Sequence, residues 1–324
     1  MDLHITKKHE SKNMNIQSLA LYIGAIAILA IFTIACRIAG KQFLTVTNIQ
    51  NIITQSSVIA VIAIGQSVVI LTGGIDLSVG SVVGFVGILG GLLIKSGMPL
   101  GLVCLIILIS GIIIGICNGS LISYGKVPAF IVTLGSMQII RGLTMVLNSG
   151  RPISGFPSSL RAIMNTRLFG MPISILYVFI LYAVMIFIMN KTRLGRWIYA
   201  VGGNREAATL AGVRTNKIEL SAYAISSLFA SIAGILLLSR LSYADPNAGS
   251  GYELDAIAAA VIGGIAMSGG KGNIGNTLIG ALILAMLKTG LQVLNVPVYF
   301  QTIIIGLSII MAVYFDKADE RKSE

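Results

Sequence analysis

Long apolar runs follow one another along almost the whole chain, and few charged residues interrupt them. A run of about 20 such residues matches the thickness of a bilayer when it forms a helix. The runs lack the strict alternation of apolar and polar residues that marks a membrane barrel strand. The pattern therefore predicts about ten transmembrane helices. They are expected near residues 17–36, 50–71, 79–94, 100–123, 129–147, 172–189, 218–240, 253–267, 276–293 and 298–315.

Composition agrees with this pattern. Hydrophobic residues make up 55% of the 324 residues and charged residues only 11%, whereas about 25% of a soluble domain is charged. We therefore expect an all-α, polytopic integral membrane protein with one transmembrane domain, residues 17–315.

The N-terminal segment resembles a lipoprotein signal, because a basic run precedes an apolar run that ends in "TIAC". However, Thr33 stands where such a signal has a Leu-like residue, and many further apolar runs follow. An uncleaved first span is expected.

The basic residues indicate the orientation of the spans. The connection 190–217 carries six lysines and arginines against the single acid Glu206, and the tails 1–16 and 316–324 also carry basic residues. Basic connections stay in the cytoplasm, so both termini are predicted to be cytoplasmic. Arg151, Arg161 and Arg167 conflict with this rule, because they lie in an outer connection. The net charge of +11 follows from such topology signals, so no nucleic-acid partner is expected.

The two halves of the chain echo each other. "VPAFIVTLG" (127–135) resembles "VPVYFQTIIIG" (296–306), and "GGIDLSVGSVVG" resembles "GYELDAIAAAVIGG" upstream of them. Five predicted spans separate the equivalent positions, and this odd number inverts the second copy relative to the membrane. Two inverted repeats of this kind are typical of transporters.

The first repeat contains a helix break with an acid. Gly73 and Gly74 precede Asp76 and Ser78, which suits a broken backbone followed by a helix start with Asp76 or Ser78 as its cap. Such backbone at membrane depth survives only where protein or water satisfies it, so this segment is expected to line a cavity or to lie at its mouth. The alternatives are a translocation pathway and a plain cap at the membrane surface, and they are not exclusive. The later glycines Gly80, Gly84, Gly87 and Gly91 share one helix face and predict a packing seam.

The second repeat has the same theme. Glu253 and Asp255 begin an Ala/Gly-rich helix, where acids stabilise the first turn, so capping explains them without a pathway role. Arg141 and Lys288 fall in or near predicted spans. Snorkelling to an interface is one interpretation, and a role in the pathway or in contact with a partner is the other.

Catalytic and metal-binding motifs are not found in the sequence. "MSGGKGNIGN" (267–276) fails as a phosphate loop because Gly272 follows Lys271 and Ile265 stands at the position of the first glycine. Cys36, Cys104 and Cys117 are far apart, have no metal-ligand spacing, and are interpreted as packing residues. The chain is therefore not expected to be an enzyme or to bind a metal.

Three motifs, in order, resemble one family. "LTGGIDLSVGS" (71–81), "LGRWIYAVGGNREAATLAGV" (194–213) and "GSGYELDAIAAAVIGGIAMSGGKGNIGNTLIGALIL" (249–284) are similar to the membrane subunits of bacterial ABC importers for monosaccharides, the ribose-type permeases. The likeness runs from about residue 42 to 315. It implies a ten-span subunit of the bacterial inner membrane that pairs with a copy of itself or a close relative. This subunit would receive sugar from an extracytoplasmic binding protein and be driven by a separate ATP-binding subunit. ATP and magnesium would be bound by that partner, and no cofactor by this chain.

The resemblance also places a cytoplasmic coupling segment at Val201 to Val213. The residues agree with it, since glycine and asparagine end the preceding stretch, a glutamate and alanines favour a short helix and Gly212 stops it. A short projecting helix suits docking into a groove of a soluble partner; a solvated loop is the alternative. The coupling residues are Gly203, Asn204, Arg205, Glu206, Ala207, Ala208, Gly212 and Val213.

Other functions stay open at this point. An ion-coupled secondary transporter would use Asp76, Glu253 or Asp255 for a proton or sodium ion. A related ABC permease would carry nucleosides or branched-chain amino acids. A scaffolding membrane protein would leave the broken glycine segment without a purpose.

Overall fold

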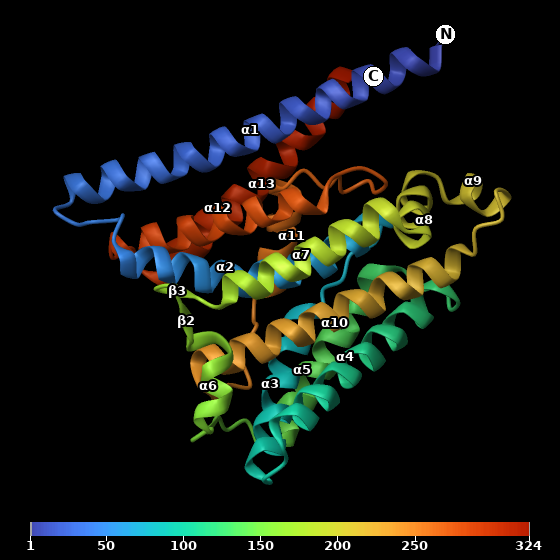
Figure 1. Ribbon diagram of the computed structural model, residues 1–324. Coiled ribbons are helices and arrows are strands. Elements are labelled where there is room, and N and C mark those ends of the chain that lie inside the picture. Colours follow the sequence, from blue (N-terminus) through green and yellow to red (C-terminus); the bar gives the residue numbers. More distant parts are fainter. Residues whose placement is uncertain (1, 324) are drawn as a thin grey trace.

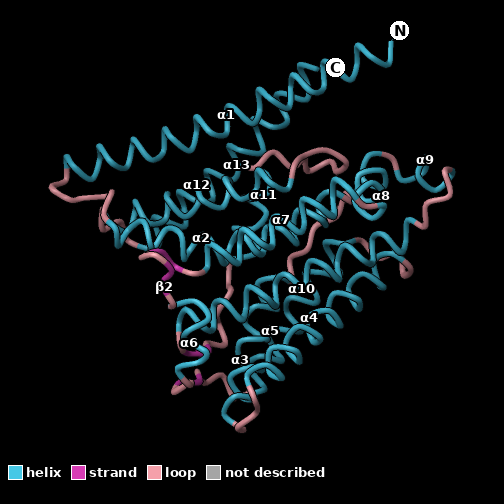
Figure 2. Tube along the Cα trace, viewed as in Figure 1, coloured by secondary structure: helices cyan, strands magenta, loops and turns pink. Residues whose placement is uncertain are grey.

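The computed structural model describes residues 2–323, and nearly all regular structure in it is helical (Figures 1 and 2). Residues 1 and 324 of the predicted tails lie outside this range. Seven helical stretches of the described chain are long and apolar enough to cross a membrane, which confirms a polytopic membrane protein. They are Leu19–Ile38, which forms the end of α1 (Asp2–Ile38), α2 (Val46–Leu71), α4 (Leu100–Ser123), α5 (Ala129–Leu147), α7 (Ser174–Lys191), α10 (Thr215–Leu241) and α12 (Ile274–Val293).

Three further helices coincide with the remaining predicted spans. They are α3 (Val79–Lys95) and α11 (Tyr252–Ile262), which have 17 and 11 residues, and α13 (Val298–Ser323). The predicted span 253–267 is wrong at its end, because α11 stops at Ile262 and Gly264 has a φ of +83°. Two consecutive glycines favour that stop, since Gly264 adopts a conformation that side chains disfavour.

The other elements lie in the connections between the long helices. The helices are α6 (Ser158–Asn165), α8 (Arg193–Gly203) and α9 (Arg205–Leu210), and the strands are β1 (Ile153–Ser154), β2 (Arg167–Leu168), β3 (Met171–Pro172) and β4 (Tyr243–Ala244). β1 pairs antiparallel with β4, and β2 pairs with β3. The pairing of β1 with β4 ties the connection after α5 to the segment before α11.

The packing of α2–α5 is repeated in α10–α13. α2 and α10 contact each other, and Figure 1 shows them running in opposite directions. α10 packs against α3 and α4, while α2 packs against the corresponding helices α11 and α12. Two structurally equivalent sets of helices in opposite senses agree with the predicted duplication.

Burial separates a core from an apolar outer surface. α2 and α10 contribute most of the buried residues, and α2 is buried on all sides from Ser56 to Leu71. α4 instead exposes apolar side chains such as Leu105, Ile109 and Ile113. A helix apolar on every side belongs to a core, and exposed apolar faces of this extent suit lipid or another membrane subunit. The core therefore lies where the two sets of helices meet.

Candidate functional site

The break between α2 and α3 is buried in the core. α2 ends at Leu71, Gly73 has a φ of +83°, and the non-helical chain continues to Ser78. Asp76 and Ser78 are both completely buried. Protein therefore surrounds Asp76 on every side, and its carboxylate is not a solvent-exposed cap.

Hydrogen bonds from three helices hold Asp76. Its carboxylate accepts from the Ser78 N–H (2.9 Å), the Ser78 hydroxyl (2.6 Å) and the Ser226 hydroxyl on α10 (2.9 Å). Asn118 on α4 donates to the Ser78 hydroxyl at 3.0 Å. In the orientation that satisfies both groups, the Gln66 amide donates to the Asp76 carbonyl (3.0 Å) and accepts from its N–H (3.3 Å). These five residues form the Asp76 cluster.

The cluster explains how α3 can begin within the core. Ser78 occupies the N-cap position without a side-chain cap bond, and Asp76 accepts from both its N–H and its hydroxyl. Buried polar groups in low dielectric are costly unless they are paired, and the cluster pairs them. Sequence analysis missed Gln66, Asn118 and Ser226, although each is a polar residue within an apolar run.

The second break precedes α11 and is held by charges. Lys288 on α12 forms an ion pair with Asp255, and both side chains are largely buried. Arg141 on α5 donates to the carbonyls of Ala248 (2.9 Å) and Pro246 (3.3 Å) in the turns between β4 and α11. Glu253 accepts from the Gly251 N–H at 3.2 Å.

These contacts revise the interpretation of the two cations. Lys288 and Arg141 do not snorkel to an interface, because each is bound to a partner within the chain. Arg141 satisfies carbonyls of the non-helical turns before α11, which have no helical partners, as buried non-helical backbone requires. Both cations therefore hold the second break in place.

The predicted glycine seam holds at three of its four positions. An added Cβ would meet Glu253 and the Gly249 carbonyl at Gly80, the Ala248 carbonyl at Gly84, and Phe156 at Gly91. Gly87 has nothing within 4 Å, so it is not part of the seam. At Gly80 and Gly84 the neighbouring backbone belongs to the turns before α11 rather than to another helix, so these two glycines make room for the second break.

The connection 190–217 contains the expected short helix. α9 begins after Asn204, whose side chain accepts from the Ala207 N–H at 2.9 Å, and has Glu206 in its first turn. Gly212 has a φ of +82° and follows the last turn. Asparagine as cap and glycine as terminator confirm the predicted local structure. Figure 1 shows α9 at the far end of the molecule from α6.

One connection element was not predicted. α8 occupies residues that the sequence left without a helix, and Gly203 is its last residue. The Tyr199 hydroxyl donates to the Gly272 carbonyl at 2.9 Å, and burial raises the pKa of Tyr199, so the hydroxyl stays a donor at neutral pH. An added Cβ at Gly202 would collide with the carbonyl of Leu71. α8 thus lies directly against the end of α2.

The side chains of α9 divide into two faces. Ala208 is buried against the protein, whereas Leu210 is 90% exposed. Val213 closes the turn with an N–H that donates to the Ala208 carbonyl at 3.0 Å. Leu210 is an apolar side chain directed away from the chain's own packing, and sequence analysis did not single it out.

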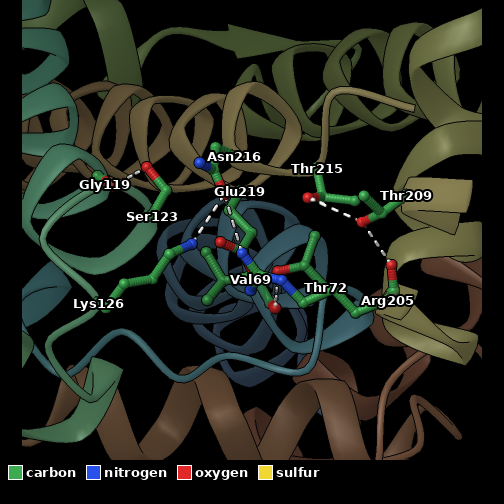
Figure 3. Close-up of polar contacts among 10 residues, drawn as sticks. All are labelled: Val69, Thr72, Gly119, Ser123, Lys126, Arg205, Thr209, Thr215, Asn216 and Glu219. Carbon is green, nitrogen blue, oxygen red and sulfur yellow. Dashed lines mark hydrogen bonds and ion pairs between the residues drawn. The ribbon is translucent and has the colours of Figure 1, made fainter. Parts of the chain in front are cut away.

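Arg205 connects α9 to α10. Its guanidinium donates to the Glu219 carboxylate and to the Asn216 side-chain oxygen, the latter at 3.0 Å. Lys126, in the connection after α4, donates to the same Asn216 oxygen at 3.0 Å (Figure 3). A cavity of about 520 Å³ opens beside these contacts between α9 and the start of α10.

The cysteines differ in their surroundings. Cys36 is buried, Cys104 is half-buried and Cys117 is exposed on α4, so packing within the chain accounts for Cys36 best. Within residues 2–323, no group of three or more His, Cys, Asp or Glu residues is placed to hold a metal ion.

Comparison with known proteins assigns the class of this fold. The family described as a permease component of the branched-chain amino acid transport system matches residues 48–313. The ribose import permease protein of Haemophilus influenzae is 41% identical, covering 95% of this chain and 97% of that relative. The chain belongs to this family of transport permeases.

Two further relatives are also similar along most of their length. The ribose import permease protein of Escherichia coli strain K12 is 41% identical over 90% of this chain and 92% of its own length. The xylose transport system permease protein of the same strain is 32% identical over 96% of this chain and 94% of its own length. No solved structure matches the chain. The chain is thus a membrane permease subunit, and a family of this kind implies an ATP-binding partner and a substrate-binding protein.

Proposed function

We propose that this chain is the membrane-spanning subunit of an ATP-driven importer for a monosaccharide, either ribose or a similar sugar. The observation that carries the proposal is the 41% identity to ribose import permeases along almost the whole chain. The family description names branched-chain amino acids, but the three relatives described above are named for ribose or xylose. An amino-acid or nucleoside cargo is therefore not favoured.

The geometry of α9 supports a soluble driving partner. Leu210 is exposed at the end of the molecule that carries the basic connection, and an exposed apolar side chain on a short helix suits a groove in another protein. We place this end in the cytoplasm because of its basic residues, with both termini on the same side. ATP and magnesium bind to the partner, and this chain binds no cofactor.

The opposite end would face the binding protein. Arg151, Arg161 and Arg167 are exposed there, on the connection that carries α6 and β2. Cations on an outward surface attract an acidic partner and speed its encounter. The exposed apolar faces of α4 and α5 leave room for a second copy of the chain in the membrane, and we propose a homodimer in the bacterial inner membrane. In this dimer, the breaks at Asp76 and Asp255 shape the pathway.

Co-purification and transport test the proposal. The tagged chain, extracted from the membrane, is expected to bring an ATP-binding chain with it. Proteoliposomes with the binding protein and internal ATP should accumulate labelled ribose or xylose and should not accumulate leucine. Uptake that follows an ion gradient without the ATP-binding chain would instead identify a secondary transporter and overturn the importer.

The docking surface has its own test. Leu210→Asp should abolish co-purification of the ATP-binding chain without lowering thermal stability, because Leu210 contributes nothing to the core. Leu210→Met, which keeps the apolar surface, serves as the matched control. Normal co-purification of Leu210→Asp would show that α9 is not the docking element.

A further inference from the structure

Arg205 holds two successive turns of α10 at once. Its two terminal nitrogens reach Glu219 and Asn216, which lie three residues apart and therefore on the same side of the helix. A guanidinium can bind two acceptors in a fixed fork, whereas an ammonium acts as a point charge. A displacement of Arg205 therefore acts on the body of α10 and not only on one side chain (Figure 3).

The face of α10 that holds Arg205 continues to the first break. Glu219, Tyr223 and Ser226 follow at intervals of four and three residues, so they lie along one side of the helix. Tyr223 is buried, and an added Cβ at Gly74 would collide with its hydroxyl. Ser226 donates to the carboxylate of Asp76 at 2.9 Å. The face thus touches the break 72–78 at two points.

The exposure of the pair is uneven. The Glu219 side chain is 9% exposed and the Arg205 side chain is 42% exposed. The second carboxylate oxygen of Glu219 is buried and has no hydrogen-bond partner among the described residues. Glu219 is therefore a buried acid that depends on cations from outside the helix core, and Arg205 is the one that α9 supplies.

We propose that the Arg205–Glu219 pair is the link through which displacement of α9 reaches the break 72–78. The path runs from Arg205 to Glu219, along α10 to Tyr223 and Ser226, and from these to Gly74 and Asp76. Arg205 and Glu219 are positioning residues in this path. The inference rests on the proposed function, since it assumes that an ATP-binding partner moves α9.

A double-mutant cycle in the complete importer tests the link. Arg205→Gln, Glu219→Gln and the double variant are purified with the ATP-binding chain and reconstituted with the sugar-loaded binding protein. Arg196→Gln is the matched control, because it removes an exposed cation from α8. The measured quantities are basal ATP hydrolysis, its stimulation by the binding protein, and sugar uptake per ATP.

Loss of the link should uncouple the two activities. Coupling between sites commonly changes activity about fivefold or more, so uptake per ATP should fall by about that factor in Arg205→Gln and Glu219→Gln. Basal hydrolysis should persist in Glu219→Gln, which leaves the docking helix α9 unchanged. The double variant should be no worse than either single variant, because residues that act as one unit are not additive. Arg205→Lys should recover part of the coupling, since it keeps the charge and loses the fork.

Three outcomes would contradict the link. Unchanged uptake per ATP in Arg205→Gln would overturn it, and so would additive losses in the double variant. A loss that matches the fall in intact, monodisperse complex would show a purely structural role and would also overturn it. Failure of the wild-type complex to couple ATP to uptake would instead overturn the proposed function. If Arg205→Gln does not assemble, Asn216→Ala is used instead, because it removes one of the two acceptors of the Arg205 guanidinium. Its effect is also measured as sugar uptake per ATP.

Discussion

The two helix breaks are built alike but are held by different forces. α3 and α11 each follow non-helical chain, and each is bound by a residue on the next helix. Asn118 precedes the end of α4 by five residues, as Lys288 precedes the end of α12. Asn118 donates a neutral hydrogen bond, whereas Lys288 forms an ion pair with Asp255.

The difference has a consequence for movement. Separating a buried ion pair leaves two charges in low dielectric, which is costly. The Asp76 cluster contains hydroxyl and amide groups that can exchange partners. The break at Asp76 is therefore the one suited to rearrange, and the break at Asp255 is the more fixed of the two.

The largest expected effect comes from breaking the ion pair. Lys288→Met leaves Asp255 buried without its counter-charge, and removing one partner of a buried pair costs about 3–5 kcal/mol. Thermal unfolding in detergent and the yield from membranes measure the loss. Lys288→Met combined with Asp255→Leu should recover much of the stability. A double variant as unstable as the single one would show that the charges are not the cause.

The next largest effect is expected at Asp76. Asp76→Ala removes the acceptor for Ser78 and Ser226, and buried donors without an acceptor should cost about 2–3 kcal/mol in total. Asp76→Asn keeps one carbonyl oxygen as an acceptor, and its amide N–H can donate to the Ser226 hydroxyl oxygen. This variant should therefore lose much less stability than Asp76→Ala. The same unfolding assay compares them. Equal losses from Asp76→Asn and Asp255→Asn would contradict the distinction between the two breaks.

The contact between α3 and the second break gives a smaller effect with an internal control. Gly84→Ala places a methyl group 2.7 Å from the Ala248 carbonyl, and such overpacking costs about 1–3 kcal/mol. Gly87→Ala, one turn along the same helix, meets nothing within 4 Å and should be neutral or stabilising by up to about 1 kcal/mol. Destabilisation by both variants would mean that helix flexibility, rather than contact, governs α3.

The smallest effect is expected at Asn118. Asn118→Leu removes one hydrogen bond to Ser78, which is worth about 1 kcal/mol, because the Ser78 hydroxyl keeps Asp76 as its acceptor. This loss should be well below that of Lys288→Met at the equivalent position. Unfolding midpoints of the two variants, measured side by side, provide the comparison. A loss at Asn118 as large as that at Lys288 would remove the contrast.

Apolar runs, caps and breakers predicted much of the fold. Glu206, the following alanines and Gly212 identified α9, and paired glycines identified the break before α3, because these signals depend on a few neighbouring residues. The end of α11 was missed, because the apolar run continues past Gly263 although the helix ends at Ile262.

The partners of the charged residues could not be read from the sequence. Snorkelling was one interpretation of Arg141 and Lys288 because their partners are distant in the sequence. The partners of Arg141 lie 105 and 107 residues away, and the partner of Lys288 lies 33 residues away. Ser226 could not be recognised as a partner of Asp76, because the two residues lie 150 positions apart in the sequence. Such contacts depend on which helices meet, and local patterns do not specify that.

The pairing of Lys288 with Asp255 also affects how the protein responds to the membrane voltage. Moving one elementary charge through 100 mV changes the free energy by about 2.3 kcal/mol. An ammonium and a carboxylate that travel together carry no net charge, so the pair adds almost no electrical work to a shift of α11 with α12. The membrane voltage therefore neither drives nor opposes movement of the pair itself.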